Sequence, residues 1–342
     1  MRIIDNLTQF PQLLNYPIVA IGVFDGLHRG HQIILQRLVE RARQKQGTSV
    51  LLTFFPHPQK VISPGDAPPL LQTEAQKERM LEELDVDIMV RLPFTRKLSL
   101  YTPAQFAREV LHNHGIREIH VGSNFRFGHQ RSGDLQTLKS LGQEFQFEVH
   151  EIRPVYFRDN RISSTSIRSL LRDGRVALAR RLLGRPYQIS GIVVRGSEKG
   201  IQLGFPTANL DPENELIPAP GVYASRAHLN GELFPSVTNV GYRPTLYQKS
   251  NSRPVIETHL LDFDENVYGK PMKLEFCLRL RAEKKFENVR DLRKQIGRDV
   301  QETRKYAARL AKILKEENHA IKYQGGWKNC GPCQFEVRPQ RT

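Results

Sequence analysis

The stretch Gly22–His31, GVFDGLHRGH, decides the first half of the fold. It continues the apolar run Pro17–Phe24 and leads into His31–Lys45, whose apolar residues recur at helical spacing. Glycines let a backbone approach phosphate closely, and the free N–H groups of a helix N-terminus attract anions. His28 and His31 share the first helical turn, so both imidazoles can stabilise charge on one reacting phosphate. We expect these two residues to be catalytic, and the residues that bind the nucleotide around them to be Gly22, Phe24, Asp25, Gly26 and Gly30.

Strands and helices continue to alternate after this loop. The pattern predicts strands at Ser49–Phe55, Val86–Arg91 and Glu118–Gly122, and helices at Thr73–Leu84 and Pro103–His114. Such alternation is typical of right-handed βαβ units, and so of a Rossmann-like α/β domain with a parallel sheet and helices on both faces. Ligands should then lie beyond the carboxyl ends of the strands.

The pattern changes from about Tyr187 onward. Gly221–Leu229 and Glu232–Val240 flank Asn230-Gly231, which is a strong signal for a two-residue hairpin. Apolar and polar residues alternate over Met272–Leu280, as in a half-buried antiparallel strand. Several strands joined by turns predict a small antiparallel β-barrel.

A long helical pattern at Asn288–Glu317 follows the barrel, and we expect Gly297 to kink or divide it. The change from α/β to all-β texture falls at Leu183–Pro186, where Gly and Pro punctuate the chain. We therefore expect one domain at residues 1–183, a second at 184–317, and a disordered tail at 318–342.

A second cluster of polar residues, Ile162–Arg168, precedes the helical pattern Leu170–Leu183. The hydroxyls of Ser164 and Thr165 would lie where a helix N-terminus binds anions, and Arg168 with Arg161 would neutralise pyrophosphate. The alternative is an ordinary serine-rich cap beside a surface arginine. A third segment follows the strand that ends at Gly122, and its aromatic and amide side chains suit a nucleobase or another flat ligand through Gly122, Asn124 and Phe127.

Taken in their order along the chain, Gly22–His31, the loop after Gly122 and Ile162–Arg168 resemble the motifs of the nucleotidyltransferase superfamily. That resemblance leaves the acceptor open among pantetheine phosphate, nicotinamide mononucleotide, glycerol phosphate and FMN. The strand exit Leu52–Pro58, with Phe54 and His57, resembles the flavin-side motif of bacterial FAD synthetases. By itself it would also fit a strand that is simply terminated by prolines.

The barrel half contains a second set of candidate residues. In the segment Gly200–Leu210, an extended backbone would place Thr207 and Asn209 on one side, where hard oxygen ligands suit Mg²⁺ bound to ATP phosphates. Gly204 and Pro206 belong to the same loop. Glu257, within an apolar strand, is placed to accept a proton from an attacking alcohol, although an outward-facing strand glutamate is the simpler alternative.

With these segments the chain resembles the bifunctional bacterial riboflavin kinase/FAD synthetases over residues 1–317. The resemblance implies a six-stranded barrel in which Thr207 and Asn209 bind MgATP and Glu257 activates the 5′-hydroxyl of riboflavin. It also implies that FMN is then adenylylated to FAD, with riboflavin, FMN and ATP as substrates. Ile201 departs from the pattern, because relatives often carry arginine there.

Composition and charge exclude several other classes of protein. The 342 residues are 39% hydrophobic, without an apolar run of the roughly 18 residues that span a membrane, and the N-terminus lacks a signal-peptide core. Three cysteines exclude a disulfide scaffold, so we expect a cytoplasmic protein. The net charge of +15 suits polyanionic nucleotide substrates, and neither a nucleic acid nor a membrane is expected as a partner.

Cys330 and Cys333 form a Cys-Gly-Pro-Cys run in the tail. Redox cysteines of this spacing work at the start of a helix, and zinc needs four ligands, so we expect an appendage without either function. Two rival functions stay open: an adenylyltransferase for another phosphorylated acceptor, and a basic nucleic-acid-binding protein without catalysis.

Overall fold

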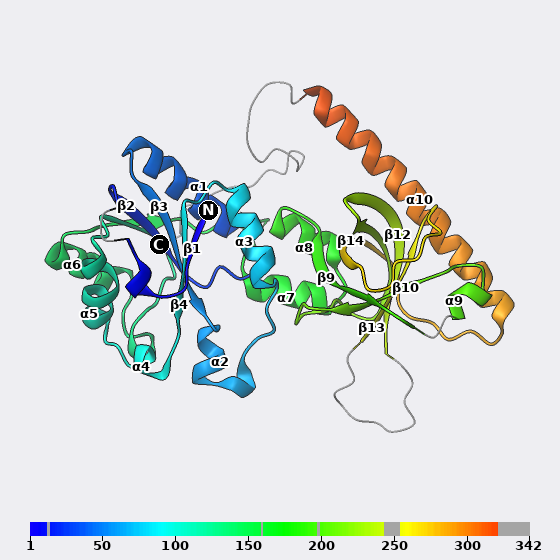
Figure 1. Ribbon diagram of the computed structural model, residues 1–342, viewed down its shortest axis with the longest axis horizontal. Coiled ribbons are helices and arrows are strands. Elements are labelled where there is room, and N and C mark those ends of the chain that lie inside the picture. The colour runs from blue at the N-terminus through cyan, green and yellow to red at the C-terminus, as the bar shows by residue number, and fades with distance from the viewer. Residues whose placement is uncertain (12–13, 159, 197–198, 243–253, 321–342) are drawn as a thin grey trace. The chain divides into compact units, whose positions relative to one another are not determined.

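A computed structural model describes residues 1–11, 14–158, 160–196, 199–242 and 254–320 of the chain (Figure 1). The chain divides into two compact units, one formed by residues 1–163 and the other beginning at Ser164. Each unit has its own sheet and its own core.

The first unit is built on a six-stranded sheet with the order β1-β4-β3-β2-β5-β6. All of its neighbouring strands run parallel, which confirms the predicted Rossmann-like sheet. The strands are β1 Arg2–Ile4, β2 Pro17–Ile21, β3 Thr48–Phe55, β4 Ile88–Pro93, β5 Glu118–Gly122 and β6 Glu148–Ile152.

Helices cover both faces of this sheet (Figure 1). Successive residues of β2 explain why: Ile18 belongs to a core shared with α1 (Arg29–Gln44) and α3 (Glu74–Glu83), whereas Val19 belongs to a core shared with α6 (Leu135–Phe145). Because side chains alternate along a strand, a wholly apolar strand needs a layer on each side.

The predicted helix at Pro103–His114 is present but irregular. It starts as α5 (Pro103–Phe106), continues as a π-helical turn at Ala107–Leu111, and ends as a 3₁₀ turn at His112–His114. The remaining short elements of this unit are α2 Pro58–Ile62, α4 Arg96–Ser99, β7 Tyr156–Phe157, β8 Asn160–Arg161, and 3₁₀ turns at Leu7–Gln9, Pro64–Asp66 and His129–Arg131.

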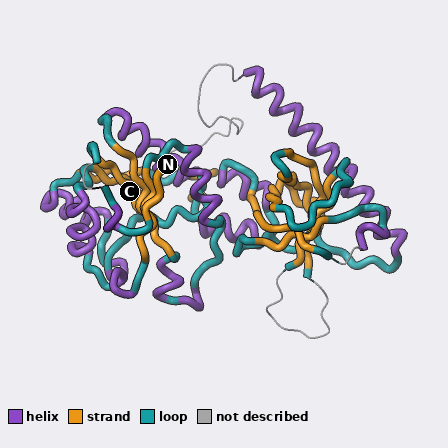
Figure 2. The backbone as a smooth tube through the Cα atoms, viewed as in Figure 1, coloured by secondary structure: helices purple, strands orange, loops and turns teal. Residues whose placement is uncertain are grey.

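The second unit contains a closed barrel with the strand order β10-β13-β12-β11-β14-β9 (Figure 2). Every neighbouring pair is antiparallel, which confirms the predicted barrel. Asn230 and Gly231 turn the β11–β12 hairpin with φ values of 52° and 85°, as a two-residue turn of this type requires. The strands are β9 Tyr187–Val194, β10 Ala208–Pro212, β11 Gly221–Leu229, β12 Glu232–Gly241, β13 Val255–Leu260 and β14 Pro271–Arg281.

Hydroxyl groups line part of the buried face of this barrel. Ser225 Oγ lies 2.6 Å from Thr238 Oγ1, which lies 3.0 Å from Thr258 Oγ1. Ser225 also donates to the carbonyl of Ser236 at 2.9 Å. These contacts satisfy the buried hydroxyl groups. Because side chains alternate along a strand, Glu257, which is next to the buried Thr258, faces outward.

The helices of the second unit are α7 (Ser164–Arg172), α8 (Val176–Leu183), α9 (Lys199–Gln202) and α10 (Val289–Ala320). α10 packs against β11 and β12, with Val300 beside the buried Val222 and Val237. Arg281 donates to the buried Asp299 of this helix at 2.8 Å. The prediction that Gly297 divides the helix is wrong, because packing on the barrel outweighs the cost of about 1 kcal/mol of one helical glycine.

The expected disordered tail concerns residues 318–342. Its first three residues belong to α10, and residues 321–342 lie outside the described residues. The Cys330–Cys333 run therefore lies outside them as well.

Helices α7 and α8 precede the predicted domain boundary but pack in the same unit as the barrel. α8 contacts β9 and β14, and the N–H of Ala219 donates to the carbonyl of Leu171 in α7 at 2.9 Å. If the second domain begins at Ser164 rather than at residue 184, an isolated fragment should need α7 and α8 for its full stability.

We expect the fragment 164–342 to be more stable than the fragment 184–342 by about 3 kcal/mol or more, the value of burying two leucine-sized side chains. Leu171 and Leu182 are both buried in the complete chain. Urea unfolding of the two fragments checks this. Equal stabilities would mean that α7 and α8 are dispensable and that the boundary lies at residue 184.

Candidate active sites

The loop after β2 is held in an unusual conformation. Phe24 and Leu27 adopt positive φ values of 51° and 36°, which side-chain-bearing residues adopt only under constraint. Gly26 has φ 83°, and a Cβ on it would lie 2.6 Å from Leu71 Cδ1, so both its backbone and its surroundings require glycine.

Neighbouring side chains supply the constraint. Thr53 Oγ1 donates to the carbonyl of Val23 at 3.1 Å, and Gln72 Nε2 donates to that of Phe24 at 3.2 Å. The Asp25 carboxylate accepts the N–H of Leu71 at 2.9 Å. Asp25, predicted as a nucleotide contact, thus has a structural contact in the loop.

His28 and His31 lie together at the N-terminus of α1. Their rings stack with centroids 3.7 Å apart and an interplanar angle of 16°. His28 caps the helix, because its Nδ1 accepts the N–H of His31 at 3.3 Å. Gly30 allows this approach, since a Cβ there would lie 3.2 Å from the His28 ring. The structure therefore brings both predicted phosphate donors to one helix end.

Residues after β3 and β5 reach the same edge of the sheet, because β2 lies between these strands. His57 follows β3 and caps α2 by accepting the N–H of Gln59 at 3.1 Å. Asn124 follows β5, and its Oδ1 lies 3.5 Å from the position of a Cβ on Gly122. The Gly22 N–H donates to Leu52 at 3.1 Å, which ties the first loop to β3.

The aromatic candidates of this unit differ in exposure. Phe54 is partly buried and packs edge-on against Phe94 at 5.7 Å. Phe127 is 7% exposed and lies in the core, 5.8 Å from Phe106. Phe127 is therefore mainly a packing residue, and Phe54 is the more accessible of the two.

The remaining residues of the predicted pyrophosphate cluster lie in two different units. Arg161 is exposed on β8 of the first unit. Ser164 and Thr165 are the first residues of α7, which starts six residues earlier than the predicted pattern at Leu170. Arg168 lies in the same helix and is buried. These α7 residues belong to the second unit.

A row of three polar side chains crosses the outside of the barrel. Asn209 of β10 and Asn239 of β12 both stand directly opposite Glu257 of β13. Directly paired residues on neighbouring strands point to the same face, about 5 Å apart. The predicted pair Asn209 and Glu257 is therefore brought together, on the face opposite the buried hydroxyls.

The loop before β10 closes over Thr207 and Asn209. A Cβ on Gly200 would lie 3.0 Å from Thr207 Oγ1, and one on Gly196 would clash with the Asn209 amide. Asn209 is 6% exposed, and among the described residues its Oδ1 has no hydrogen-bond partner. A buried oxygen without a donor, beside a hydroxyl, fits a hard cation such as Mg²⁺.

Sequence reasoning assigned no role to Asn239, His259 or Arg293. His259 Nδ1 lies 2.7 Å from the carbonyl of Pro206, and its ring meets that of Phe205 edge-on at 5.6 Å, so it supports the predicted loop. Arg293 of α10 places Nη2 3.6 Å from the position of a Cβ on Gly204. Only strand register and the path of α10 reveal these neighbours.

Tyr223 of β11 is a core residue of the barrel. It is fully buried, its hydroxyl donates to the carbonyl of Ala219, and its ring packs edge-on against Phe276 at 5.3 Å. Burial raises the pKa of its hydroxyl to about 12. Tyr223 therefore stabilises the barrel.

Comparisons with known proteins agree with this two-part arrangement. The family model described as FAD synthetase matches residues 11–166, and the one described as riboflavin kinase matches residues 183–307. The chain therefore combines the domains of two transferases, a FAD synthetase and a riboflavin kinase.

Curated relatives that align over most of their length show which family the chain belongs to. The chain is 35% identical over 297 residues to the bifunctional riboflavin kinase/FMN adenylyltransferase of Bacillus subtilis. The aligned region covers 86% of this chain and 94% of that protein. The chain is 37% identical over 301 residues to the Escherichia coli K12 protein of the same description, covering 87% and 95%. The chain belongs to the family of bifunctional riboflavin kinase/FMN adenylyltransferases.

One solved structure supports the fold over most of the chain. A protein from Streptococcus pneumoniae described as a macrolide-efflux protein superposes with a TM-score of 0.81 at 28% identity, covering 88% of this chain and 98% of that one. Within the described residues, no helix combines the length and apolar character needed to span a membrane.

Proposed function

We propose that this chain phosphorylates riboflavin with ATP to FMN and then adenylylates FMN with a second ATP to FAD, releasing pyrophosphate. The observation that carries the kinase half is the row in which Asn209 stands directly opposite Glu257, with a buried Oδ1 that has no hydrogen-bond partner in the described part of the chain. The paired histidines at the N-terminus of α1 support the adenylyl-transfer half.

In the kinase step, Glu257 accepts the proton of the riboflavin 5′-hydroxyl as that oxygen attacks the γ-phosphorus of ATP and ADP leaves. Thr207 and Asn209 hold Mg²⁺, and Gly204 and Pro206 shape the loop beside the phosphates. When bound, the cation neutralises charge on the phosphate oxygens. Asn239, on the other side of Glu257, is placed to orient the carboxylate by donating a hydrogen bond.

In the adenylyl-transfer step, the FMN phosphate attacks the α-phosphorus of ATP and pyrophosphate leaves. A phosphate dianion is already a nucleophile, so this step needs no general base. His28 and His31 stabilise the charge that develops on the α-phosphate, next to the positive end of the α1 helix dipole. Gly22, Phe24, Asp25, Gly26 and Gly30 form the loop that brings backbone to the nucleotide.

The pyrophosphate and flavin contacts follow from the same proposal. Arg161, Arg168, Ser164 and Thr165 neutralise or hydrogen-bond the departing pyrophosphate. Phe54 and His57 contact the flavin, and Gly122 and Asn124 form the nucleobase side, with Phe127 as a packing residue of that loop. Riboflavin, FMN and ATP are then the partners, without nucleic acid or membrane, and the three cysteines favour work in a reducing cytoplasm.

One incubation tests the proposal. The complete chain is incubated with riboflavin and MgATP, and the flavins are separated by chromatography. The expected result is FMN followed by FAD. If riboflavin stayed unphosphorylated while FMN added to a parallel incubation became FAD, the kinase half of the proposal would be refuted. No flavin product together with a salt-sensitive shift of DNA or RNA would favour the nucleic-acid-binding rival.

The magnesium ligands make a separate prediction. We expect Asn209→Ala to lower the kcat/KM of riboflavin phosphorylation about 100-fold, because losing even an outer partner of a metal costs 10–100-fold. The loss should shrink as the Mg²⁺ concentration rises. FAD formation from FMN is the internal control, and Asn266→Ala, in an exposed turn, is the matched variant. An unchanged Mg²⁺ requirement would exclude Asn209 as a ligand.

A further inference from the structure

A polar cluster lies on strands β5 and β6, at the end of the sheet opposite the proposed nucleotide loops. In the parallel register, Glu118 pairs with Glu148 and His120 pairs with His150, so all four side chains share one face of the sheet. The neighbouring groups that contact this cluster are Arg41 of α1 and Tyr16, which precedes β2.

Three of these side chains form a set with metal-ligand spacing. His150 Nε2 lies 3.1 Å from Glu118 Oε2, and His120 Nε2 lies 3.8 Å from the same oxygen. One ligand atom from each residue lies within 4.8 Å of the other two. Zinc bound at about 2.1 Å by a tetrahedral set holds its ligand atoms about 3.4 Å apart, so small side-chain rotations complete the geometry.

The two innermost members are almost wholly removed from solvent. Glu118 is 0% exposed and His120 is 4% exposed. Within the described part of the chain, neither ring nitrogen of His120 has a hydrogen-bond partner, since 3.8 Å to Glu118 is too long for one. A buried polar group without a partner costs about 1–3 kcal/mol, which a ligand at this position would offset.

Glu118 is held in place from behind. Arg41 donates to both carboxylate oxygens, with Nε at 2.8 Å from Oε2 and Nη2 at 2.9 Å from Oε1. The Tyr16 hydroxyl donates to Oε1 at 3.0 Å. Oε2, the oxygen nearest both histidines, keeps capacity for a ligand. Partners of this kind orient metal-binding carboxylates in many proteins.

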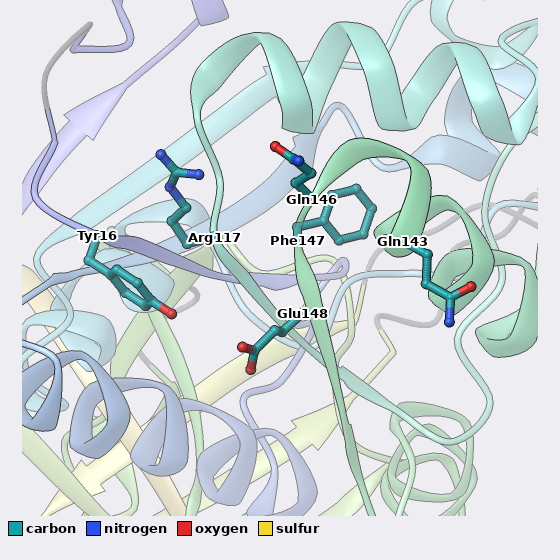
Figure 3. Close-up of a pocket in the computed structure, with 7 residues that line it drawn as sticks. Tyr16, Arg117, Gln143, Gln146, Phe147 and Glu148 are labelled. Carbon is teal, nitrogen blue, oxygen red and sulfur yellow. The ribbon is translucent and has the colours of Figure 1, made fainter.

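A pocket lies next to the cluster, because Tyr16 and Glu148, which line it, contact Glu118 and His150. The pocket has a volume of about 660 Å³ and is lined by residues that include Tyr16, Arg117, Gln143 and Glu148. Figure 3 shows the Tyr16 hydroxyl and the Glu148 carboxylate turned toward each other. Glu148 Oε2 lies 3.3 Å from His150 Nε2, so this exposed carboxylate adds negative charge beside the cluster, and a water molecule can supply the fourth ligand.

We propose that Glu118, His120 and His150 bind a divalent first-row transition metal, most naturally Zn²⁺. Two imidazoles and one carboxylate suit zinc and its neighbours better than Mg²⁺, which prefers oxygen ligands alone. The pocket opens where β5 and β6 begin, whereas the proposed nucleotide loops follow the carboxyl ends of the strands. The ion therefore ties two strands to each other and is separate from the proposed flavin chemistry.

The test uses the complete chain carrying Cys330→Ser and Cys333→Ser, so that the tail thiols do not bind zinc. After treatment with a chelator, and without nucleotide, Zn²⁺ is titrated by calorimetry and Co²⁺ by visible absorption. We expect one ion per chain, a Co²⁺ spectrum typical of a four-coordinate site, and a higher melting temperature with Zn²⁺.

Variants assign the site. His150→Gln, on an edge strand and partly exposed, should bind Zn²⁺ about 100-fold more weakly, and Tyr16→Phe, which loses one contact to Glu118, about tenfold more weakly. His112→Gln, outside the cluster, should bind as the parent does. No stoichiometric binding by the parent, or unchanged affinity in His150→Gln, would overturn the proposal.

Discussion

Replacing Glu257 by Gln should leave riboflavin unphosphorylated while FMN supplied directly still becomes FAD. The substitution keeps the size and reach of the side chain beside Asn209 and Asn239 but removes its basicity. Loss of a general base lowers rates by about 10²–10⁴-fold. Chromatography of the flavins from parallel incubations with riboflavin and with FMN measures both activities in one preparation.

Intact FMN adenylylation excludes unfolding of the whole chain, and because the barrel has its own core, thermal unfolding of Glu257→Gln must also show that the barrel is folded. Glu232→Gln is a matched control, since Glu232 is an exposed glutamate on the neighbouring strand β12. Normal riboflavin phosphorylation by Glu257→Gln would make Glu257 an ordinary strand residue, and the base would have to be sought elsewhere on the barrel.

Replacing His28 by Ala should have the opposite effect, with FMN accumulating and FAD formation falling about 10²–10³-fold. This is the loss typical of removing one donor to a developing charge in a transition state. Riboflavin phosphorylation in the same incubation should continue at the parental rate. The measurement is the ratio of FAD to FMN over time.

A second variant at this position is needed because His28 also caps α1. Asparagine is a good N-cap residue, so His28→Asn should keep the stability of the helix while still losing the phosphate donor. We therefore expect both variants to lose FAD formation and only His28→Ala to lose stability in thermal unfolding, by about 1 kcal/mol. An unchanged FAD yield from His28→Asn would exclude the catalytic role of the imidazole.

Elements with strong local signals could be predicted from the sequence. The apolar run of β2 followed by glycines gave the strand–loop–helix unit, and Asn230-Gly231 gave the β11–β12 hairpin. In these two cases the local conformational preference and the final packing agree. The strand predicted over Met272–Leu280 is present as β14, but its predicted alternation of buried and exposed residues fails after Phe276, because Cys277 is buried and Leu278 is exposed where the pairing with β11 shifts register.

Elements that depend on distant partners could not be predicted from the sequence. β1 has only three residues, and β6 carries polar residues at most positions, because it pairs with β5 at the edge of the sheet. The continuity of α10 through Gly297 depends on packing against the barrel.

The same limit applies to the site residues. Spacing alone indicated Thr207 and Asn209, but the alignment of Asn209 and Asn239 with Glu257 requires strand register. His120 and His150 are thirty residues apart in the sequence and meet only because β5 and β6 pair.

The two units differ in how they are protected against self-association through their strands. The closed barrel offers no row of unpaired backbone groups to another chain, whereas the open sheet of the first unit ends at β1 and β6. β1 is very short, and β6 places Glu148 and Glu151 at exposed positions, where repulsion between like charges opposes pairing with a second copy. The charged edge strand that holds His150 therefore also discourages fibre-like stacking of the first unit.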